Sequence, residues 1–237
     1  MPDCGIEEVL WIESLISDGR CSHVSAIVAQ CDLSRPQADT ETYLAALLEA
    51  SPDRLRGVRY ILDYNGKYEK GSNNGTHVGC TRHNLDYLRD PTASLRFEDG
   101  FKLLSRFNLS FDLQCAPVQL PAAAKICERY PDVVVCIDHM GRPHDLKIDI
   151  IPTSSLGSDA YHFVIPEETS EKMAVWRHGM QLMAKLPHVY VKLSMLGYGV
   201  PGKLIFSILI ALLFCSVQLI IHLCYQDGTK TKLRKCS

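Results

Sequence analysis

Two adjacent ionisable residues, Asp138 and His139, follow an apolar run at positions 133–137. Histidine has an unperturbed pKa of about 6.5, so His139 could carry a proton or position a water molecule at neutral pH. Asp138 could orient His139 or cap the end of a strand. Because neighbouring side chains on a strand point in opposite directions, we expect only His139 to face a pocket. The alternative is that both residues are structural.

The stretch around this pair predicts a buried strand that ends in a tight turn. Five apolar residues without polar alternation, at 133–137, favour a strand covered on both faces, as in a parallel sheet between helices. Gly141 permits a tight turn, and Pro143 prevents the strand from continuing. Ionisable groups at the carboxyl end of such a strand lie where α/β proteins usually carry their active sites.

Hydrophobic periodicity predicts helices and strands in alternation along the chain. The expected strands are 24–31, 57–63, 109–115, 133–139 and 189–194, and the expected helices are 6–16, 40–50, 95–107, 121–130 and 167–186. In the last helix, a stripe of large apolar residues is expected in the core: Met173, Trp176, Met180 and Met183. This order implies parallel strands with right-handed helical crossovers, and long loops at 64–91 and 144–166.

Length and composition fit one large or two small α/β domains. The chain has 237 residues and a net charge of -2, which gives no electrostatic reason to expect a nucleic-acid partner. The ten cysteines include no C-x-x-C pair, which is typical of reduced cysteines in an intracellular protein. The N-terminus has no basic region followed by an apolar core, so we expect no secretory signal.

An uncharged apolar segment at 204–225 precedes a basic tail. The segment is long enough for a membrane-spanning helix. Three interpretations remain open: a membrane anchor, a buried helix that completes a barrel, and non-native sequence such as an unspliced intron or a frame change. The first interpretation would place the protein at a membrane. Without an anchor we expect a cytoplasmic protein.

Five short motifs occur in an order that resembles one enzyme family. They are Arg56-Gly57-Val58-Arg59, Ser110-Phe111-Asp112-Leu113-Gln114, Asp138-His139-Met140-Gly141-Arg142-Pro143, Trp176-Arg177-His178-Gly179-Met180 and Val191-Lys192-Leu193-Ser194. Residues 5–200 look like the amidohydrolase-related hydrolases, specifically the branch of sugar-lactone and pyrone-dicarboxylate lactonases. The resemblance implies a TIM barrel whose active site lies at the carboxyl ends of its strands.

The resemblance implies a partial barrel with about five of the eight strands, the third through the seventh. Residues 1–200 would form this incomplete α/β domain, and 201–237 would form a hydrophobic helix and a basic tail. The family's His-x-His pair after the first strand does not occur in this sequence, and the apolar segment stands where an eighth strand ending in Asp would follow. We therefore expect a chain truncated at both ends, with little or no activity.

The resemblance also implies roles for individual residues. His139 corresponds to the catalytic histidine after the sixth strand. Arg59 and Arg142 correspond to positions that bind acidic substrate groups, since a guanidinium can hold a carboxylate with two hydrogen bonds. Gln114 stands at a metal-ligand or pocket position of the fifth strand, and because glutamine is a poor metal ligand we predict no metal-binding residue. Lys192 could reach a pocket, but it is interpreted as a lysine that extends from a strand end into solvent.

The reaction implied by the resemblance is hydrolysis of a lactone of a sugar acid or dicarboxylate by an activated water molecule. Intact relatives can hold a single divalent metal such as zinc, so a metal cofactor stays open. The expected partner is a small acidic lactone, with a membrane contact only if 204–225 is a true anchor. The alternative is a non-enzymatic, membrane-tethered barrel fragment that acts as a binding or scaffold module.

Overall fold

The computed structural model describes residues 4–64, 85–143, 146–147, 149–152, 161–195 and 218–220. In this part of the chain, six parallel strands form one sheet in the order β1-β2-β3-β4-β7-β8. These strands are β1 (Ile27–Gln30), β2 (Leu55–Ile61), β3 (Ser110–Gln114), β4 (Val135–Ile137), β7 (Val189–Lys192) and β8 (Gln218–Ile220). The helices are α1 (Gly5–Ser17), α2 (Gln37–Ala50), α3 (Pro91–Phe101), α4 (Leu103–Arg106), α5 (Leu120–Arg129) and α6 (Glu167–Met183). The predicted α/β alternation with parallel strands is confirmed.

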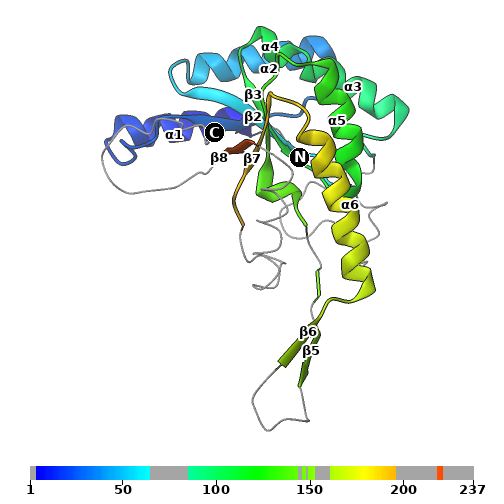
Figure 1. The fold of residues 1–237 in the computed structure, drawn as a ribbon. Helices are drawn as coiled ribbons and strands as arrows, with labels where there is room; N and C mark the ends of the chain where they lie inside the picture. Colours follow the sequence, from blue (N-terminus) through cyan, green and yellow to red (C-terminus); the bar gives the residue numbers. More distant parts are fainter. Residues whose placement is uncertain are drawn as a thin grey trace.

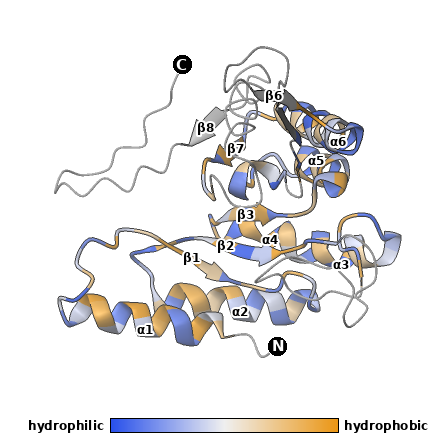
Figure 2. Cartoon of the chain, turned by 90° about the horizontal axis from the view of Figure 1, so that it is seen from below, coloured by the Kyte–Doolittle hydropathy of each residue, from blue (hydrophilic) through white to orange (hydrophobic). Residues whose placement is uncertain are grey.

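The helices cover one face of the sheet (Figures 1 and 2). Alternate residues such as Phe111 and Leu113 of β3 or Val189 and Val191 of β7 are buried under them. The aromatic rings of Phe97, Phe101 and Phe111 pack edge-on or tilted at centroid distances of 5.5–5.7 Å. Such pairs add stability beyond the apolar area that they bury. The predicted stripe on α6 is also in this core, because Trp176, Met180 and Met183 are fully buried.

The opposite face of the sheet is more open, and this corrects one prediction. In β4 and the two residues before it, Val133, Val135 and Ile137 are buried, whereas Val134 is 45% exposed and Cys136 is half-buried. The strand is therefore covered by helices on one face only. In a closed barrel the other face is the interior. An unbroken apolar run cannot distinguish this arrangement from burial on both faces.

The third predicted helix begins earlier than its apolar pattern suggests, because a polar cap lies outside that pattern. The carboxylate of Asp90 accepts hydrogen bonds from the backbone N–H groups of Thr92 (2.9 Å) and Ala93 (2.8 Å), and Pro91 occupies the first helical position. Both features stabilise a helix start. The helix is interrupted at Lys102, so the predicted segment 95–107 is divided into α3 and α4.

The stretch 144–166 was predicted to be a loop, and this is wrong for eight of its residues. The strands β5 (Asp149–Pro152) and β6 (Tyr161–Val164) pair antiparallel and form a hairpin that projects beyond the end of α6 (Figure 1). Short strands outside the main sheet carry little periodic signal, which explains why the sequence pattern missed them. Most of the other predicted loop, 64–91, lies outside the described residues.

The predicted hydrophobic helix is wrong at the three residues of 204–225 that the structure describes. Gln218–Ile220 forms strand β8, which pairs parallel with β7 through Tyr190, Val191 and Lys192. The rest of that segment lies outside the described residues. Among the residues described, no helix is both long and apolar enough to cross a membrane.

Gly179 allows α6 to approach the start of α5 closely. A Cβ atom added at this position would lie 2.5 Å from the Cβ of Leu120, which is too close for two carbon atoms. Alanine is normally the better helix former. We nevertheless expect Gly179→Ala to lower the free energy of unfolding by about 1–3 kcal/mol through overpacking. Urea denaturation measures this, with the exposed Gln181→Ala as control. A stabilised Gly179→Ala variant would contradict the close approach.

Candidate active site

The register of the sheet places a row of polar side chains on its open face. Arg59 of β2 lies opposite Asp112 of β3, which lies opposite Cys136 of β4 and then Tyr190 of β7. Residues two further along each strand point to the same face. These positions, close to the carboxyl ends of the strands, are occupied by Ile61, Gln114, Asp138 and Lys192.

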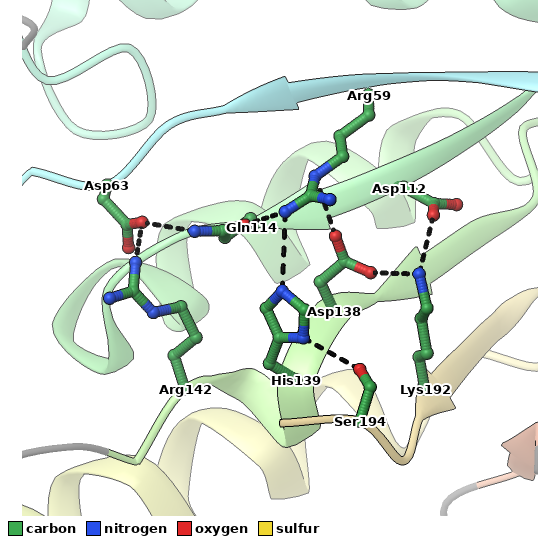
Figure 3. A network of polar contacts seen from close by, with 9 residues as sticks. All are labelled: Arg59, Asp63, Asp112, Gln114, Asp138, His139, Arg142, Lys192 and Ser194. Atoms are coloured by element: carbon green, nitrogen blue, oxygen red, sulfur yellow. Dashed lines mark hydrogen bonds and ion pairs between the residues drawn. The ribbon is translucent and has the colours of Figure 1, made fainter. Parts of the chain in front are cut away.

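Asp138 lies between two cations (Figure 3). One carboxylate oxygen is 3.0 Å from Nε of Arg59, and the other is 3.2 Å from Nζ of Lys192. Lys192 is also 3.7 Å from the carboxylate of Asp112. The Asp138 side chain has no exposed surface, whereas those of Arg59 and Lys192 are 33% and 27% exposed. The carboxylate is thus hidden behind the cations, and the cations face the open side of the sheet.

A left-handed turn after β4 positions His139. The residues His139, Met140, Gly141 and Arg142 all have positive φ, between 51° and 70°, and the N–H of Arg142 donates to the carbonyl of His139 at 2.9 Å. Three of these residues carry side chains that disfavour this backbone conformation, which makes the turn a strained element.

Helix α6 holds the strained turn in place. The indole N–H of Trp176 donates to the carbonyl of Met140 at 2.8 Å, in the middle of the turn. A Cβ atom on Gly141 would lie 2.7 Å from the sulfur of Met180 and 3.2 Å from Nε1 of Trp176. A side chain at this position would have to displace Met180, and the φ of 70° would strain its backbone as well.

The turn also corrects the prediction that only one of Asp138 and His139 faces the site. The strand ends at Ile137, Asp138 still follows its alternation of side chains, and the left-handed residues begin at His139. Because the backbone then turns left-handed, the Asp138 carboxylate and the His139 ring both contact Arg59. Two adjacent residues therefore contribute to one site.

The contacts of His139 assign its proton. Nε2 lies 3.4 Å from Nη2 of Arg59, and Nδ1 lies 2.8 Å from the hydroxyl oxygen of Ser194. A guanidinium can only donate, so Nε2 is the acceptor and Nδ1 carries the hydrogen that is donated to Ser194. Burial lowers the pKa of His139 below its ordinary value; the Asp138 carboxylate opposes this, and the Arg59 and Lys192 cations reinforce it. The neutral ring, with its lone pair on Nε2, is the favoured form at neutral pH.

Gln114 and Arg142 extend the same network. The side-chain oxygen of Gln114 accepts a hydrogen bond from Arg59, and its amide nitrogen donates to the carboxylate of Asp63 at 3.1 Å. Arg142 forms an ion pair with the same carboxylate. The structure thus brings together all four residues proposed from the sequence, His139, Arg59, Arg142 and Gln114. Their catalytic and substrate-binding roles stay predictions.

Sequence reasoning missed three members of the network and misread a fourth. Asp63, Asp112 and Ser194 were not proposed, and Lys192 was expected to extend into solvent. Instead Lys192 contacts two carboxylates, which raise its pKa although burial alone would lower it. Asp112 could have been found from its spacing, because it stands two residues before Gln114 on the same face of one strand.

The comparisons with known proteins agree with this geometry. Residues 29–214, most of the chain, match the family profile described as amidohydrolase. The chain belongs to the amidohydrolase family. This confirms the family resemblance of the motifs, and with it the α/β barrel class of the fold.

Two curated relatives of this amidohydrolase match over part of their length. L-fucono-1,5-lactonase of Burkholderia ambifaria is 26% identical over 175 residues, which are 74% of this chain and 44% of that protein. The uncharacterised protein y4mH of Sinorhizobium fredii is 30% identical over 115 residues, which are 48% of this chain and 31% of that protein. The chain thus spans less than half the length of the curated relatives that it matches.

Solved structures share the fold of this amidohydrolase. An amidohydrolase from Burkholderia multivorans with bound zinc has a TM-score of 0.61 and 21% identity, over 92% of this chain and 63% of that chain. The same TM-score and identity are found for an amidohydrolase from that organism with bound HEPES, over 64% of that chain.

The donor set in the described part of the chain does not fit a zinc ion. No three His, Cys, Asp or Glu side chains come together there as metal ligands. The carboxylates nearest His139 are engaged by cations, since Asp138 contacts Arg59 and Lys192, and Asp112 contacts Lys192. A metal ion among them would face two positive charges. We therefore derive no step of the reaction through a metal.

The protonation of His139 can be measured directly. We expect NMR titration of its ring protons to give a pKa below 6.5, and replacement of Arg59 by glutamine to raise it, because a neighbouring positive charge is removed. The unfolded chain then binds this proton more readily than the folded chain. Stability should therefore decrease as the pH falls through about 6.5 toward the folded-state pKa. A pKa at or above 6.5 would contradict the buried, neutral ring.

Proposed function

We propose that this amidohydrolase hydrolyses lactones of sugar acids or dicarboxylates. The observation that carries the proposal is the neutral His139 ring, held between the hydroxyl of Ser194 and the guanidinium of Arg59 at the carboxyl ends of parallel strands. A positioned neutral imidazole is the usual general base for activating water, and a water molecule can replace the long contact of 3.4 Å between Nε2 and Arg59. The 26% identity with an L-fucono-1,5-lactonase over 74% of this chain supports a lactone as the substrate class.

The proposed reaction uses His139 twice. Nε2 removes a proton from a water molecule whose oxygen attacks the lactone carbonyl carbon, which forms a new C–O bond and a tetrahedral oxyanion. The carbonyl then re-forms as the ring C–O bond breaks, and the protonated imidazole gives its proton to the leaving ring oxygen. Arg59, close to His139, can stabilise the oxyanion or hold a substrate oxygen. The product is a hydroxy acid, and its ionisation releases one proton.

Proton release provides the assay. The full chain is mixed with L-fucono-1,5-lactone, a lactone bearing a free carboxylate, a linear ester and an amide, and acidification is followed with a pH indicator. We expect the two lactones to react faster than their spontaneous hydrolysis, and the ester and amide to remain at background. Turnover would also contradict the expectation, drawn from the missing His-x-His pair, that this chain has little activity.

If turnover is too slow to detect, binding of the hydroxy-acid product still tests whether the site exists. Isothermal titration with the open-chain hydroxy acids measures the site without chemistry. If neither lactone reacts and no hydroxy acid binds, the proposed site is wrong. Binding without turnover would overturn the hydrolytic function and leave a sugar-acid binding site.

A further inference from the structure

The two exposed cations of the site are arranged around one hidden anion. Arg59 and Lys192 contact opposite oxygens of Asp138, which has no exposed surface, while each cation is about one-third exposed. The two cations are the more exposed partners on the open face, since the Asp112 carboxylate beside Lys192 is only 11% exposed (Figure 3). Buried carboxylates that fix exposed cations leave the outward N–H donors directed at a ligand.

Lys192 has a donor left for such a ligand. An ammonium group has three N–H donors, and within the described part of the chain Lys192 contacts two carboxylates, Asp138 at 3.2 Å and Asp112 at 3.7 Å. The longer contact, to Asp112, is the weaker one. An incoming carboxylate can therefore compete with Asp112 for Lys192 without disturbing the shorter pair with Asp138.

We propose that Lys192, together with Arg59, forms a carboxylate-binding subsite and determines specificity for lactones that carry a free carboxylate. This assignment rests on the proposed function in one respect, namely that the ligand bearing the carboxylate is a lactone. The resemblance already implies that Arg59 binds acidic substrate groups, and the new assignment is the role of Lys192 as a second carboxylate-binding residue. Neutral lactones would lack the group that Lys192 recognises, and would bind through the remaining contacts alone.

Asp112 acts as an internal competitor in this scheme. Burial, reinforced by the neighbouring Asp138 carboxylate, raises the pKa of Asp112 to about 6, while Lys192 and Arg59 oppose the shift. The thiol of Cys136 is the other titratable group beside it. Protonation of Asp112 below pH 6 breaks its ion pair with Lys192. Binding of a ligand carboxylate to Lys192 should therefore strengthen as the pH falls from 7 to 5.5.

The test is a binding titration of the full chain at pH 7 with three linear probes: D-glucarate with two carboxylates, D-gluconate with one, and D-sorbitol with none. One carboxylate serves as the product of ring opening, and the second is the group assigned to Lys192. We expect glucarate to bind at least about tenfold more tightly than gluconate, as one charge-assisted hydrogen bond provides. Sorbitol should bind least.

Two variants with opposite expected effects on glucarate binding test the role of Lys192. Lys192→Met should remove the preference for glucarate over gluconate, whereas Lys185→Met, at an exposed lysine after α6, should retain it. Asp112→Asn should strengthen glucarate binding at pH 7 several-fold. It should also reduce the gain in affinity between pH 7 and 5.5 to the part contributed by His139, which titrates below 6.5 beside Arg59. Because a misfolded chain cannot bind more tightly, the gain in Asp112→Asn excludes a folding artefact.

The outcomes separate this inference from the proposed function. An unchanged glucarate preference in Lys192→Met, or unchanged glucarate affinity in Asp112→Asn, would overturn the subsite. If lactones are hydrolysed but glucarate has no advantage over gluconate, the subsite is wrong and the hydrolytic function stands. If glucarate binds more tightly than gluconate and this preference depends on Lys192, but no lactone reacts, the subsite stands and the hydrolytic function is wrong.

Discussion

Replacement of His139 by glutamine is expected to lower lactone hydrolysis by a factor on the order of 100 to 10,000, the usual contribution of a general base. Glutamine retains polar atoms near Nδ1 and Nε2 but cannot accept a proton at neutral pH. The loss should appear in kcat with little change in KM, because the proton is transferred in the transition state and not on binding. Steady-state kinetics with L-fucono-1,5-lactone measures it.

The pH profile gives a second signature of the same residue. In the wild-type protein kcat/KM should fall as the pH drops through the pKa of His139, below 6.5, since only the neutral ring accepts a proton. The glutamine variant should lack this acidic limb. His178→Gln, at an exposed histidine on α6, is the matched control. A His139→Gln rate within about threefold of wild type would remove His139 from the reaction, as that is less than 1 kcal/mol in the barrier.

Ser194 should matter less than His139. Its hydroxyl accepts from Nδ1 at 2.8 Å and fixes the orientation and tautomer of the ring, but it does not reach Nε2. Ser194→Ala should reduce kcat by about tenfold, the equivalent of one lost hydrogen bond. A loss as large as that of His139→Gln would instead place the hydroxyl in the chemistry.

Removal of the Trp176 side chain is expected to have the largest effect on stability. Trp176 is fully buried in the core and also donates to the carbonyl of Met140 in the left-handed turn. Trp176→Ala should lower the free energy of unfolding by about 3–5 kcal/mol, the usual cost of an emptied aromatic site. Trp176→Phe retains most of the apolar volume and leaves the carbonyl without its donor, so about 1–3 kcal/mol is expected.

The turn should respond to Trp176→Phe more than the rest of the fold. Three non-glycine residues with positive φ are held there against their preference, and the indole N–H is one of the contacts that hold them. We expect the NMR signals of the His139 ring to shift, and kcat to fall with it, while far-UV circular dichroism is retained. Trp11→Phe is the control, because Trp11 is 62% exposed on α1. Equal stability losses in the two phenylalanine variants would contradict this role of Trp176.

Much of the fold could be predicted because its signals are local. The spacing of apolar residues within one segment predicts each strand and helix of the α/β alternation, as the stripe from Met173 to Met183 predicts α6. The errors fall where local signals are weak or ambiguous. An apolar run looks the same whether one or both faces are covered, as at Val134, and the β5–β6 hairpin lies outside the main sheet.

The sequence by itself determined which residues come to the carboxyl ends of the strands, because strand ends are local features. His139 could be proposed on that basis, whereas Arg59, Arg142 and Gln114 were proposed from the family resemblance of their motifs. Only the tertiary structure decided how they are paired. Asp138 and His139 reach one site because a left-handed turn follows β4, and that turn depends on Trp176, which is 36 residues away. Lys192 faces the site because it directly follows the last residue of β7 that pairs with β4, Val191 opposite Ile137, which brings its ammonium to 3.2 Å from Asp138. Charge pairing between strands has no local sequence pattern.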